Sequence, residues 1–232
     1  MMSELCDWCM AEGTAHKKAS TLYVDKGRVE RHIKLLLGNI PVKEITRGMV
    51  EKYMYDVIKG DKIRQRAKSA NPRGVTNVKG GKYAAGRSVS LLGAIFEFAR
   101  SHNLIETNPA HGIKKPADNK KDVFLTLHEM GILGEILRLP AWVATQKTAI
   151  NAIKLLLLTG CRKDEILSLR WEYVDFAAQC FRFPDTKTGK QNRPFGLGAL
   201  HLLQGLAKHK TSLWVFPAST GSGYYVGLPH AL

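Results

Sequence analysis

Two basic residues in the second half of the chain have the type and spacing of a phosphate-binding site. The first, Arg162, follows the apolar run AINAIKLLLL and the pair Thr159-Gly160, where glycine can adopt the left-handed conformation that closes a last helical turn. A new short helix is predicted to begin at Arg162, with Glu165 in its first turn. A guanidinium stays charged and offers a planar fork of donors that matches two oxygens of one phosphate. Arg162 is therefore a candidate phosphate ligand.

The second basic residue lies in the segment from Phe181 to Phe195, which is predicted to form a β-hairpin with Thr188-Gly189 at its tip. Lys187 is next to that tip, and an ammonium that reaches a phosphodiester could neutralise charge or donate a proton to a leaving oxygen. Taken alone, a lysine in such a turn is more often a solvated hairpin residue. Glu165 could likewise form only a salt bridge to a nearby basic side chain.

The whole chain is strongly basic, with 35 Lys and Arg against 20 Asp and Glu, a net charge of +15. This excess indicates a polyanionic partner. The densest part runs from Lys62 to Arg100, with nine basic residues against one acid in a predicted loop and the helix after it. We predict that this stretch contacts a nucleic-acid backbone, although a solvated loop has the same composition. The candidate residues are Lys62, Arg64, Arg66, Lys68, Arg73, Lys79, Lys82 and Arg87.

Several classes of protein are disfavoured by the sequence. No stretch approaches the roughly 20 apolar residues of a membrane span, and Glu4 and Asp7 interrupt any signal peptide. The four cysteines do not make a disulfide framework in a chain of this length, so we expect a reducing cytoplasm. Cys6 and Cys9 form a lone Cys-x-x-Cys pair without histidines at ligand spacing, so no metal site is predicted.

Helical periodicity organises the first hundred residues. The first helix is predicted to start at Ser20 or Thr21 and to stop at Gly38, and a second to be capped by Thr46 and to end at Gly60. A third is predicted at about residues 84–102. Helices of this length with short links form a compact bundle of about 100 residues.

The chain is predicted to contain two domains. We place a helical domain at residues 1–113, a linker at 114–124 and a second domain at 125–232, whose first helix is capped by Thr126. The linker is rich in lysine, and Lys114 and Lys115 could cross a nucleic-acid backbone or simply face solvent. Lys190 and Arg193 flank the hairpin and have the same two interpretations, a phosphate contact or a solvated hairpin residue. The charge excess is +10 before Val123 and +5 from there on, so both halves could face one polyanion.

Together, the segments TGCRKDEILSLRW and TKTGK resemble the phage integrase family of tyrosine site-specific recombinases. The phrases STLYVDKGRVERHI, LLGNIPVKEIT, GAIFEFARSHNLIETNPAHGIKKP and FLTLHEMGIL extend the resemblance to nearly the whole chain. It implies a mainly α fold, with an N-terminal helical-bundle core-binding (SAM-like) domain and part of a mostly α catalytic domain that holds a small antiparallel sheet or hairpin. It also implies that the two domains clamp opposite sides of a DNA duplex.

The resemblance assigns roles to the candidate residues. In this family the arginine at the Arg162 position grips the scissile phosphate, the lysine at the Lys187 position is the general acid toward the 5′ oxygen, and Glu165 matches a supporting acidic position. A tyrosine near the C-terminus attacks the phosphodiester and leaves a 3′-phosphotyrosyl link, without a metal or other cofactor. The implied partner is double-stranded DNA at an attachment-site core, bound by a tetramer of the full-length protein, with no small-molecule substrate. A bacterial or phage-encoded cytoplasmic protein associated with the nucleoid is therefore expected.

The chain departs from the family pattern after this site. Family members carry a His-x-x-Arg box, a later His or Trp and the tyrosine nucleophile, and neither His201 nor His230 begins such a box. Tyr224 and Tyr225 lie before the place where the box should come, so we interpret them as loop aromatics. We therefore expect an integrase cut short and inactive by itself. A non-catalytic DNA-binding regulator with the same fold is the alternative, whereas an RNA-binding protein would leave both basic segments unexplained.

Overall fold

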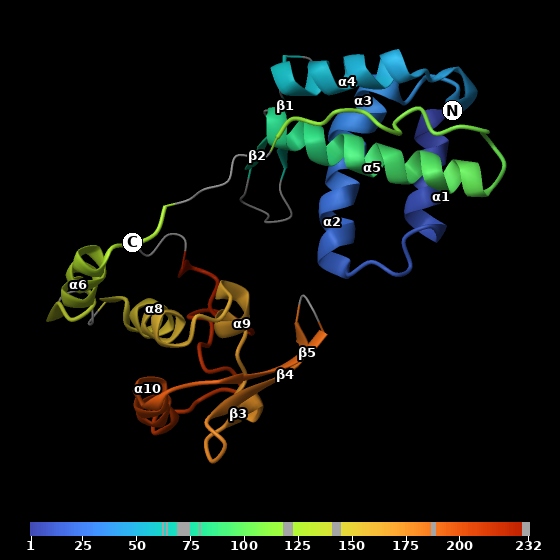
Figure 1. Cartoon of the computed structure of the whole chain (residues 1–232). Coiled ribbons are helices and arrows are strands. Elements are labelled where there is room, and N and C mark those ends of the chain that lie inside the picture. Colours follow the sequence, from blue (N-terminus) through green and yellow to red (C-terminus); the bar gives the residue numbers. More distant parts are fainter. Residues whose placement is uncertain are drawn as a thin grey trace. The chain divides into compact units, whose positions relative to one another are not determined.

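The computed structural model of the protein describes residues 1–61, 63, 65–68, 75–78, 80–117, 123–140, 145–186 and 189–228, and for 65–68 and 75–77 it describes the backbone alone. The chain divides into two compact units, Met1–Asp122 (unit 1) and Val123–Leu232 (unit 2), each with a hydrophobic core of its own. Helices dominate both units, and unit 2 adds a three-stranded antiparallel sheet (Figure 1). The predicted mainly α fold with a small sheet is confirmed.

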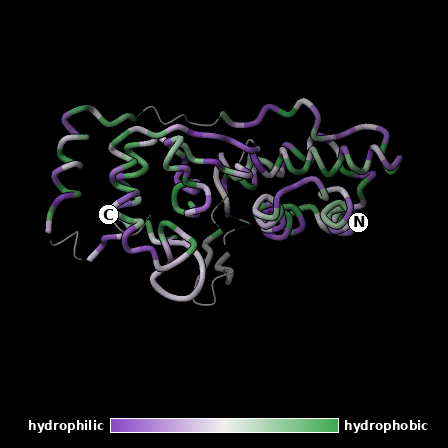
Figure 2. The backbone as a smooth tube through the Cα atoms, turned by 90° about the horizontal axis from the view of Figure 1, so that it is seen from below, coloured by the Kyte–Doolittle hydropathy of each residue, from purple (hydrophilic) through white to green (hydrophobic). Residues whose placement is uncertain are grey.

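Unit 1 is a bundle of helices around one apolar core. Hydrophobic and hydrophilic residues alternate around the helical turns (Figure 2), and Leu92, Ile95 and Phe96 of the longest helix are fully buried. That periodicity is typical of helices that bury one face. The helical segments are α1 (Met2–Glu12), α2 (Ala19–Arg28), the π-turn η1 (Val29–Ile33), α3 (Lys34–Leu37), the 3-10 turn η2 (Val42–Glu44), α4 (Arg47–Lys59) and α5 (Lys82–Ser101).

The helix limits in unit 1 agree with the sequence signals at one helix and differ at another. Thr46 caps α4, since its Oγ1 accepts a hydrogen bond from the Met49 backbone N at 3.3 Å, and Gly60 ends α4 with φ 76°. The predicted caps at Ser20 or Thr21 are wrong. The helix α2 begins at Ala19 because the backbone N–H of Thr21 already bonds to the Lys18 carbonyl, one turn earlier.

Part of the predicted basic loop is regular structure. Residues Gln65–Lys68 (β1) and Val75–Val78 (β2) pair as an antiparallel hairpin, with Gln65 opposite Val78. The prediction of a loop was wrong here, because the β-branched residues of VTNV favour an extended backbone. The backbones of Arg66 and Lys68 lie in β1, whereas Lys62, Arg64, Arg73 and Lys79 lie outside the described residues.

After α5 the chain runs back along that helix (Figure 1). The Asn108 Nδ2 donates to the Gly93 carbonyl at 2.9 Å, and the Lys115 Nζ donates to the Ser90 Oγ at 3.0 Å. Lys114 and Lys115, predicted to belong to the linker, are thus exposed residues on the surface of unit 1 beside α5.

Unit 2 begins with the predicted cap at Thr126. The Thr126 Oγ1 accepts a hydrogen bond from the Glu129 N at 3.2 Å, and the Thr126 N donates to the Glu129 Oε2 at 2.8 Å, so a full capping box is present. The elements that follow are α6 (Leu127–Ile136), α8 (Lys147–Thr159), α9 (Lys163–Leu167), the 3-10 turn η3 (Trp171–Tyr173), β3 (Val174–Asp175), β4 (Cys180–Thr186), β5 (Gly189–Pro194) and α10 (Leu197–Ala207).

The sheet of unit 2 has the order β3-β4-β5, with both pairs antiparallel. Phe181 and Phe183 of β4 are buried in the same core as Ile166 and Leu167 of α9. Side chains alternate between the two faces of a strand and directly opposite residues share a face. Arg193, which is opposite Phe181, is therefore carried on the core side of β5.

The buried Phe181 should be essential to this arrangement. We expect Phe181→Ala to lower the stability of unit 2 by about 3–5 kcal/mol, because it leaves a cavity among packed aromatic rings. The ring centroids of Phe195 and Phe183 lie 4.7 and 5.6 Å from that of Phe181. Scanning calorimetry of the whole chain measures the loss. The control is Leu197→Ala in the same unit, where the side chain is 63% exposed; equal losses for both variants would contradict the packing described.

Candidate functional site

The site is built around the turn that joins α8 to α9. Gly160 ends α8 with φ 62°, the left-handed conformation predicted for it, and Arg162 directly precedes the first residue of α9 with an extended backbone. Nearly half of the Arg162 side chain, 47%, is exposed. The turn therefore presents one guanidinium to solvent at the edge of the unit 2 core.

The carboxylate of Glu165 holds this arginine in two ways. Its Oε1 accepts a hydrogen bond from the Arg162 Nη1 at 2.7 Å, and its Oε2 accepts one from the Arg162 backbone N at 3.0 Å. The Glu165 side chain is only 9% exposed. Charge-assisted bonds of this kind are short and directional. Glu165 thus fixes both the start of α9 and the direction of the Arg162 side chain.

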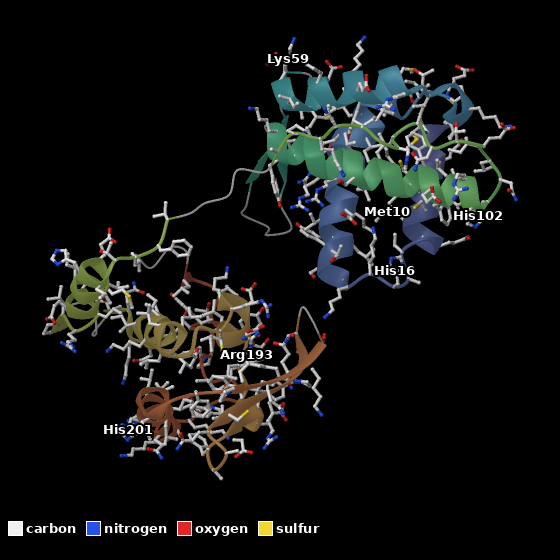
Figure 3. All side chains as sticks on the ribbon, viewed as in Figure 1. Met10, His16, Lys59, His102, Arg193 and His201 are labelled. Carbon is white, nitrogen blue, oxygen red and sulfur yellow. The ribbon has the colours of Figure 1, made fainter. Side chains whose placement is uncertain are left out.

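A second arginine, which the sequence indicated only as a residue flanking the hairpin, joins this pair. Arg193 reaches from β5 toward α9 (Figure 3), and its Nε lies 3.6 Å from the Glu165 Oε2. Its Nη2 donates a 2.7 Å hydrogen bond to the Gln191 Oε1, two residues earlier on the same face of the strand. The period-two alternation of β5 opposite the buried Phe181 and Phe183 was the signal that could have identified it.

The two arginines determine the protonation state of the Glu165 carboxyl. Burial alone raises the pKa of the Glu165 carboxyl, but the hydrogen bonds from Arg162 and the positive charges of Arg193 and Arg162 outweigh it, so its pKa lies below the ordinary 4.5. Burial also raises the pKa of the nearby Cys161 thiol. The carboxylate is therefore ionised at neutral pH, and the cluster carries one net positive charge.

This arrangement suits the binding of an oxyanion. The Nη1 of Arg162 pairs with Glu165, and the Arg162 side chain is the most exposed of the three. The other N–H donors of its planar guanidinium therefore remain available to a phosphate. Arg193, at 30% exposed, adds a second positive charge beside the same carboxylate. We call Arg162, Glu165 and Arg193 the arginine cluster.

Lys187 and Lys190 are the other two residues of unit 2 that were predicted to belong to the site. Lys187 lies outside the described residues, so its approach to Arg162 stays a prediction; the described residues on either side of the turn, Thr186 and Gly189, are paired across the hairpin. Lys190 is exposed on β5 and, by strand alternation, lies on the opposite face from Arg193. The structure does not bring it to the cluster.

In unit 1 the described candidates gather along one side of α5. Tyr83, Arg87 and Ser90 are spaced at helical intervals, the Arg87 guanidinium lies 5.2 Å from the Tyr83 ring centroid, and Lys115 is bonded to Ser90. Lys82, the first residue of α5, is exposed as well. Four of the predicted basic residues, Lys82, Arg87, Lys114 and Lys115, are thus exposed on or beside this helix.

The tyrosines and cysteines considered from the sequence lie away from the arginine cluster's contacts. The Tyr224 ring lies edge-on to Trp214 with centroids 5.3 Å apart, and the Tyr225 backbone N donates to the Phe216 carbonyl, so both belong to a loop packed on the unit 2 core. Cys6 and Cys9 are buried in α1, and burial raises the pKa of Cys6 to about 12.

The comparison with protein families assigns unit 2. Residues 133–224, which contain all three members of the arginine cluster, match the model of the Phage integrase family. This match places unit 2 in the phage integrase family. Two curated relatives come from Escherichia coli. Prophage integrase IntF of strain K12 is 34% identical over 96 residues, which are 37% of this chain and 21% of the relative. A shufflon-specific DNA recombinase is 28% identical over 211 residues, 88% of this chain and 49% of the relative. The chain thus spans about half or less of these relatives.

Solved structures of integrases share the fold. A lambda integrase (75–356) dimer bound to a COC′ core site matches with a TM-score of 0.72 and 16% identity, over 98% of this chain and 79% of that one. A lambda integrase tetramer bound to a Holliday junction gives 0.71 over 98% and 64%, also at 16% identity. The Tn1549 transposon integrase in complex with circular intermediate DNA gives 0.66 at 17% identity, over 96% and 73%. The lambda integrase is thus bound to DNA as a dimer in one of these structures and as a tetramer in another.

Two absences hold for the residues that the structure describes. None of their helices combines the length and the apolar character required to cross a bilayer. Among the same residues, no group of three or more His, Cys, Asp or Glu side chains is arranged to hold a metal ion.

The lowered pKa of Glu165 predicts a pH dependence of stability. A carboxylate whose pKa is depressed by folding stabilises the native state above its unfolded pKa, and that contribution is lost as pH falls through the folded value. We expect Glu165→Gln to be less stable than the wild type at pH 7, with the difference shrinking as pH falls below 4.5.

Urea unfolding midpoints measured across this pH range check the prediction. The matched control is Glu135→Gln on α6, where the carboxylate also pairs with an arginine but is 75% exposed. A difference between wild type and Glu165→Gln that stayed constant with pH would show that the lost charge is not the cause.

Proposed function

We propose that this chain is a DNA-binding portion of a tyrosine site-specific recombinase, and that Arg162 binds the phosphodiester at which a strand is cut and rejoined. The observation that carries the proposal is the arginine cluster, in which one largely buried carboxylate holds two guanidiniums at a solvent-accessible edge. A planar guanidinium fixed in direction is well suited to grip two oxygens of one phosphate.

The charges of the chain support a duplex partner. Both halves are basic, by +10 before Val123 and +5 after it, and unit 1 presents Lys82, Arg87, Lys114 and Lys115 on or beside α5. Phosphate contacts of this kind supply affinity and position a protein on DNA without reading its sequence. We propose that unit 1 contacts the DNA backbone through this side of α5, while unit 2 contacts the phosphate that reacts.

The proposed reaction needs no metal or other cofactor. In the complete recombinase a tyrosine attacks the phosphorus, the phosphodiester bond to the 5′ oxygen breaks, and a 3′-phosphotyrosyl link conserves the bond energy for rejoining. Arg162 stabilises the negative charge that develops on the phosphate oxygens, and Lys187 donates a proton to the leaving 5′ oxygen. Glu165 acts by orienting Arg162. We propose that strand exchange takes place in a tetramer on attachment-site DNA.

Arg162 should account for one phosphate contact. For binding to a short DNA duplex, we expect Arg162→Ala to make the slope of log K against log salt less steep by about 0.9, the value for one neutralised phosphate. Fluorescence anisotropy at several salt concentrations measures the slope. The control Arg138→Ala removes an arginine that also pairs with a glutamate three residues away but is 74% exposed, just after the end of α6. Equal changes in both variants would reject the assignment of Arg162.

The α5 surface should contribute separately. We expect the double variant Arg87→Ala/Lys115→Ala to reduce the salt slope by about 1.8, because two phosphate contacts are lost. The control is Arg100→Ala near the other end of α5, where the arginine is paired with Glu97. Unchanged affinity and slope in the double variant would remove α5 from the DNA interface and leave the assignment of Arg162 untouched.

A further inference from the structure

Unit 2 contains a second basic site, at a distance from the arginine cluster. A cavity of about 420 Å³ opens between the first turns of α8, the helix α10 and the segment that follows α10. Its charged or titratable lining residues are Lys147, His201, His209 and Lys210, and none of the described residues that line it is acidic. His201 lies on α10 (Figure 3). A pocket lined by one sign of charge concentrates ligands of the opposite sign.

The inner wall of this pocket includes a buried donor without a partner. Trp171 is 9% exposed, and its Nε1 is buried with no hydrogen-bond partner in the described part of the chain. An indole N–H can only donate, and a buried donor left without an acceptor is costly. The Lys210 Nζ lies 6.0 Å from the centroid of the Trp171 ring. The pocket wall thus combines a buried donor that lacks a partner with a nearby cation.

Much of the remaining lining is apolar. Leu202, Leu206, Val215, Phe216 and Pro217 line the cavity, and Leu213, in the segment after α10, is 54% exposed. A DNA backbone presents charged phosphates and no aliphatic side chains to such walls. A protein segment can present a carboxylate and apolar side chains together, and small-ligand and peptide sites commonly have this mixed lining.

The pocket is separate from the site proposed for phosphate. Lys147 is the first residue of α8, whereas Arg162 follows the end of that helix. A helix of 13 residues is about 20 Å long at 1.5 Å per residue. A ligand in the pocket therefore leaves the arginine cluster free.

We propose that this pocket binds an acidic segment of a protein partner. A glutamate or aspartate of the segment accepts from the Trp171 Nε1 and pairs with Lys210 or Lys147, and neighbouring apolar side chains of the segment fill the space against Leu202 and Leu206. The inference is independent of the proposed DNA chemistry, because no residue of the arginine cluster takes part.

The test uses the whole 232-residue chain and two short acetylated, amidated peptides. One contains leucine and glutamate, and the other has glutamine at every glutamate position. The indole N–H resonance of Trp171, assigned by NMR, is followed during titration. We expect the acidic peptide to shift this resonance in a saturable way and the glutamine peptide to leave it unchanged, because only a carboxylate offers the charge that the pocket lacks.

Two charge reversals on neighbouring residues separate the pocket from the general surface charge. Lys210→Glu should weaken binding of the acidic peptide by about tenfold or more, since a close charge pair becomes repulsive. Lys208→Glu removes the same charge two residues away, at an exposed lysine that does not line the cavity, and should change the affinity by less than about twofold. Unperturbed amide spectra of both variants show that the fold is intact.

Three results would overturn the proposal. They are equal binding of the two peptides, equal weakening by Lys208→Glu and Lys210→Glu, and a saturable shift of the Trp171 resonance by a short DNA duplex but not by the acidic peptide. The last of these would assign the pocket to phosphate. Saturable binding of the acidic peptide alone, lost in Lys210→Glu and kept in Lys208→Glu, supports it.

Discussion

The carboxylate of Glu165 is the group on which the candidate site depends. It takes hydrogen bonds from the side chain and the backbone of Arg162 and lies 3.6 Å from Arg193. Two guanidiniums held at one edge of a core repel each other unless an anion lies between them, and removing one partner from a buried charge pair leaves the others uncompensated. Because the same carboxylate also fixes the first turn of α9, the direction of Arg162 and the start of that helix are set together.

The remainder of unit 2 brings the partners of that carboxylate together. Glu165 belongs to a five-residue helix, and Arg193 to the last strand of the sheet, so no local preference places them in contact. The contact is produced by burial of Ile166 and Leu167 against Phe181 and by the register that places Arg193 opposite Phe181. A shift of that register by one residue would turn Arg193 to the other face of β5. The contact between Glu165 and Arg193 therefore depends on the packing of the sheet against α9.

The same physical reasoning explains which sequence motifs proved structural. Cys6 and Cys9 have the spacing of a metal or redox pair, yet both are core residues of α1, and burial raises the pKa of Cys6 to about 12, so its thiol stays protonated. The lysine-rich segment after α5 has the composition of a free linker, but in its described part, residues 114–117, Lys115 is bonded to Ser90 of α5. The composition of a segment indicates that it can face solvent, whereas the residues that it packs against decide its position.

The sequence by itself determined the features that depend on nearby residues. The caps at Thr46 and Thr126, the stops at Gly60 and Gly160, the hairpin and the closeness of Arg162 to Glu165 all follow from chemistry within a few residues. Only the tertiary structure decided that Arg193 belongs to the site, that Lys190 faces the other way, and that Trp171, which lines a basic pocket, has a donor with no partner among the described residues. Caps and helical periodicity are set by short-range geometry that the sequence displays directly. Contacts such as that between Glu165 and Arg193 depend on strand register and on packing between segments distant in the chain, which the order of residues does not display.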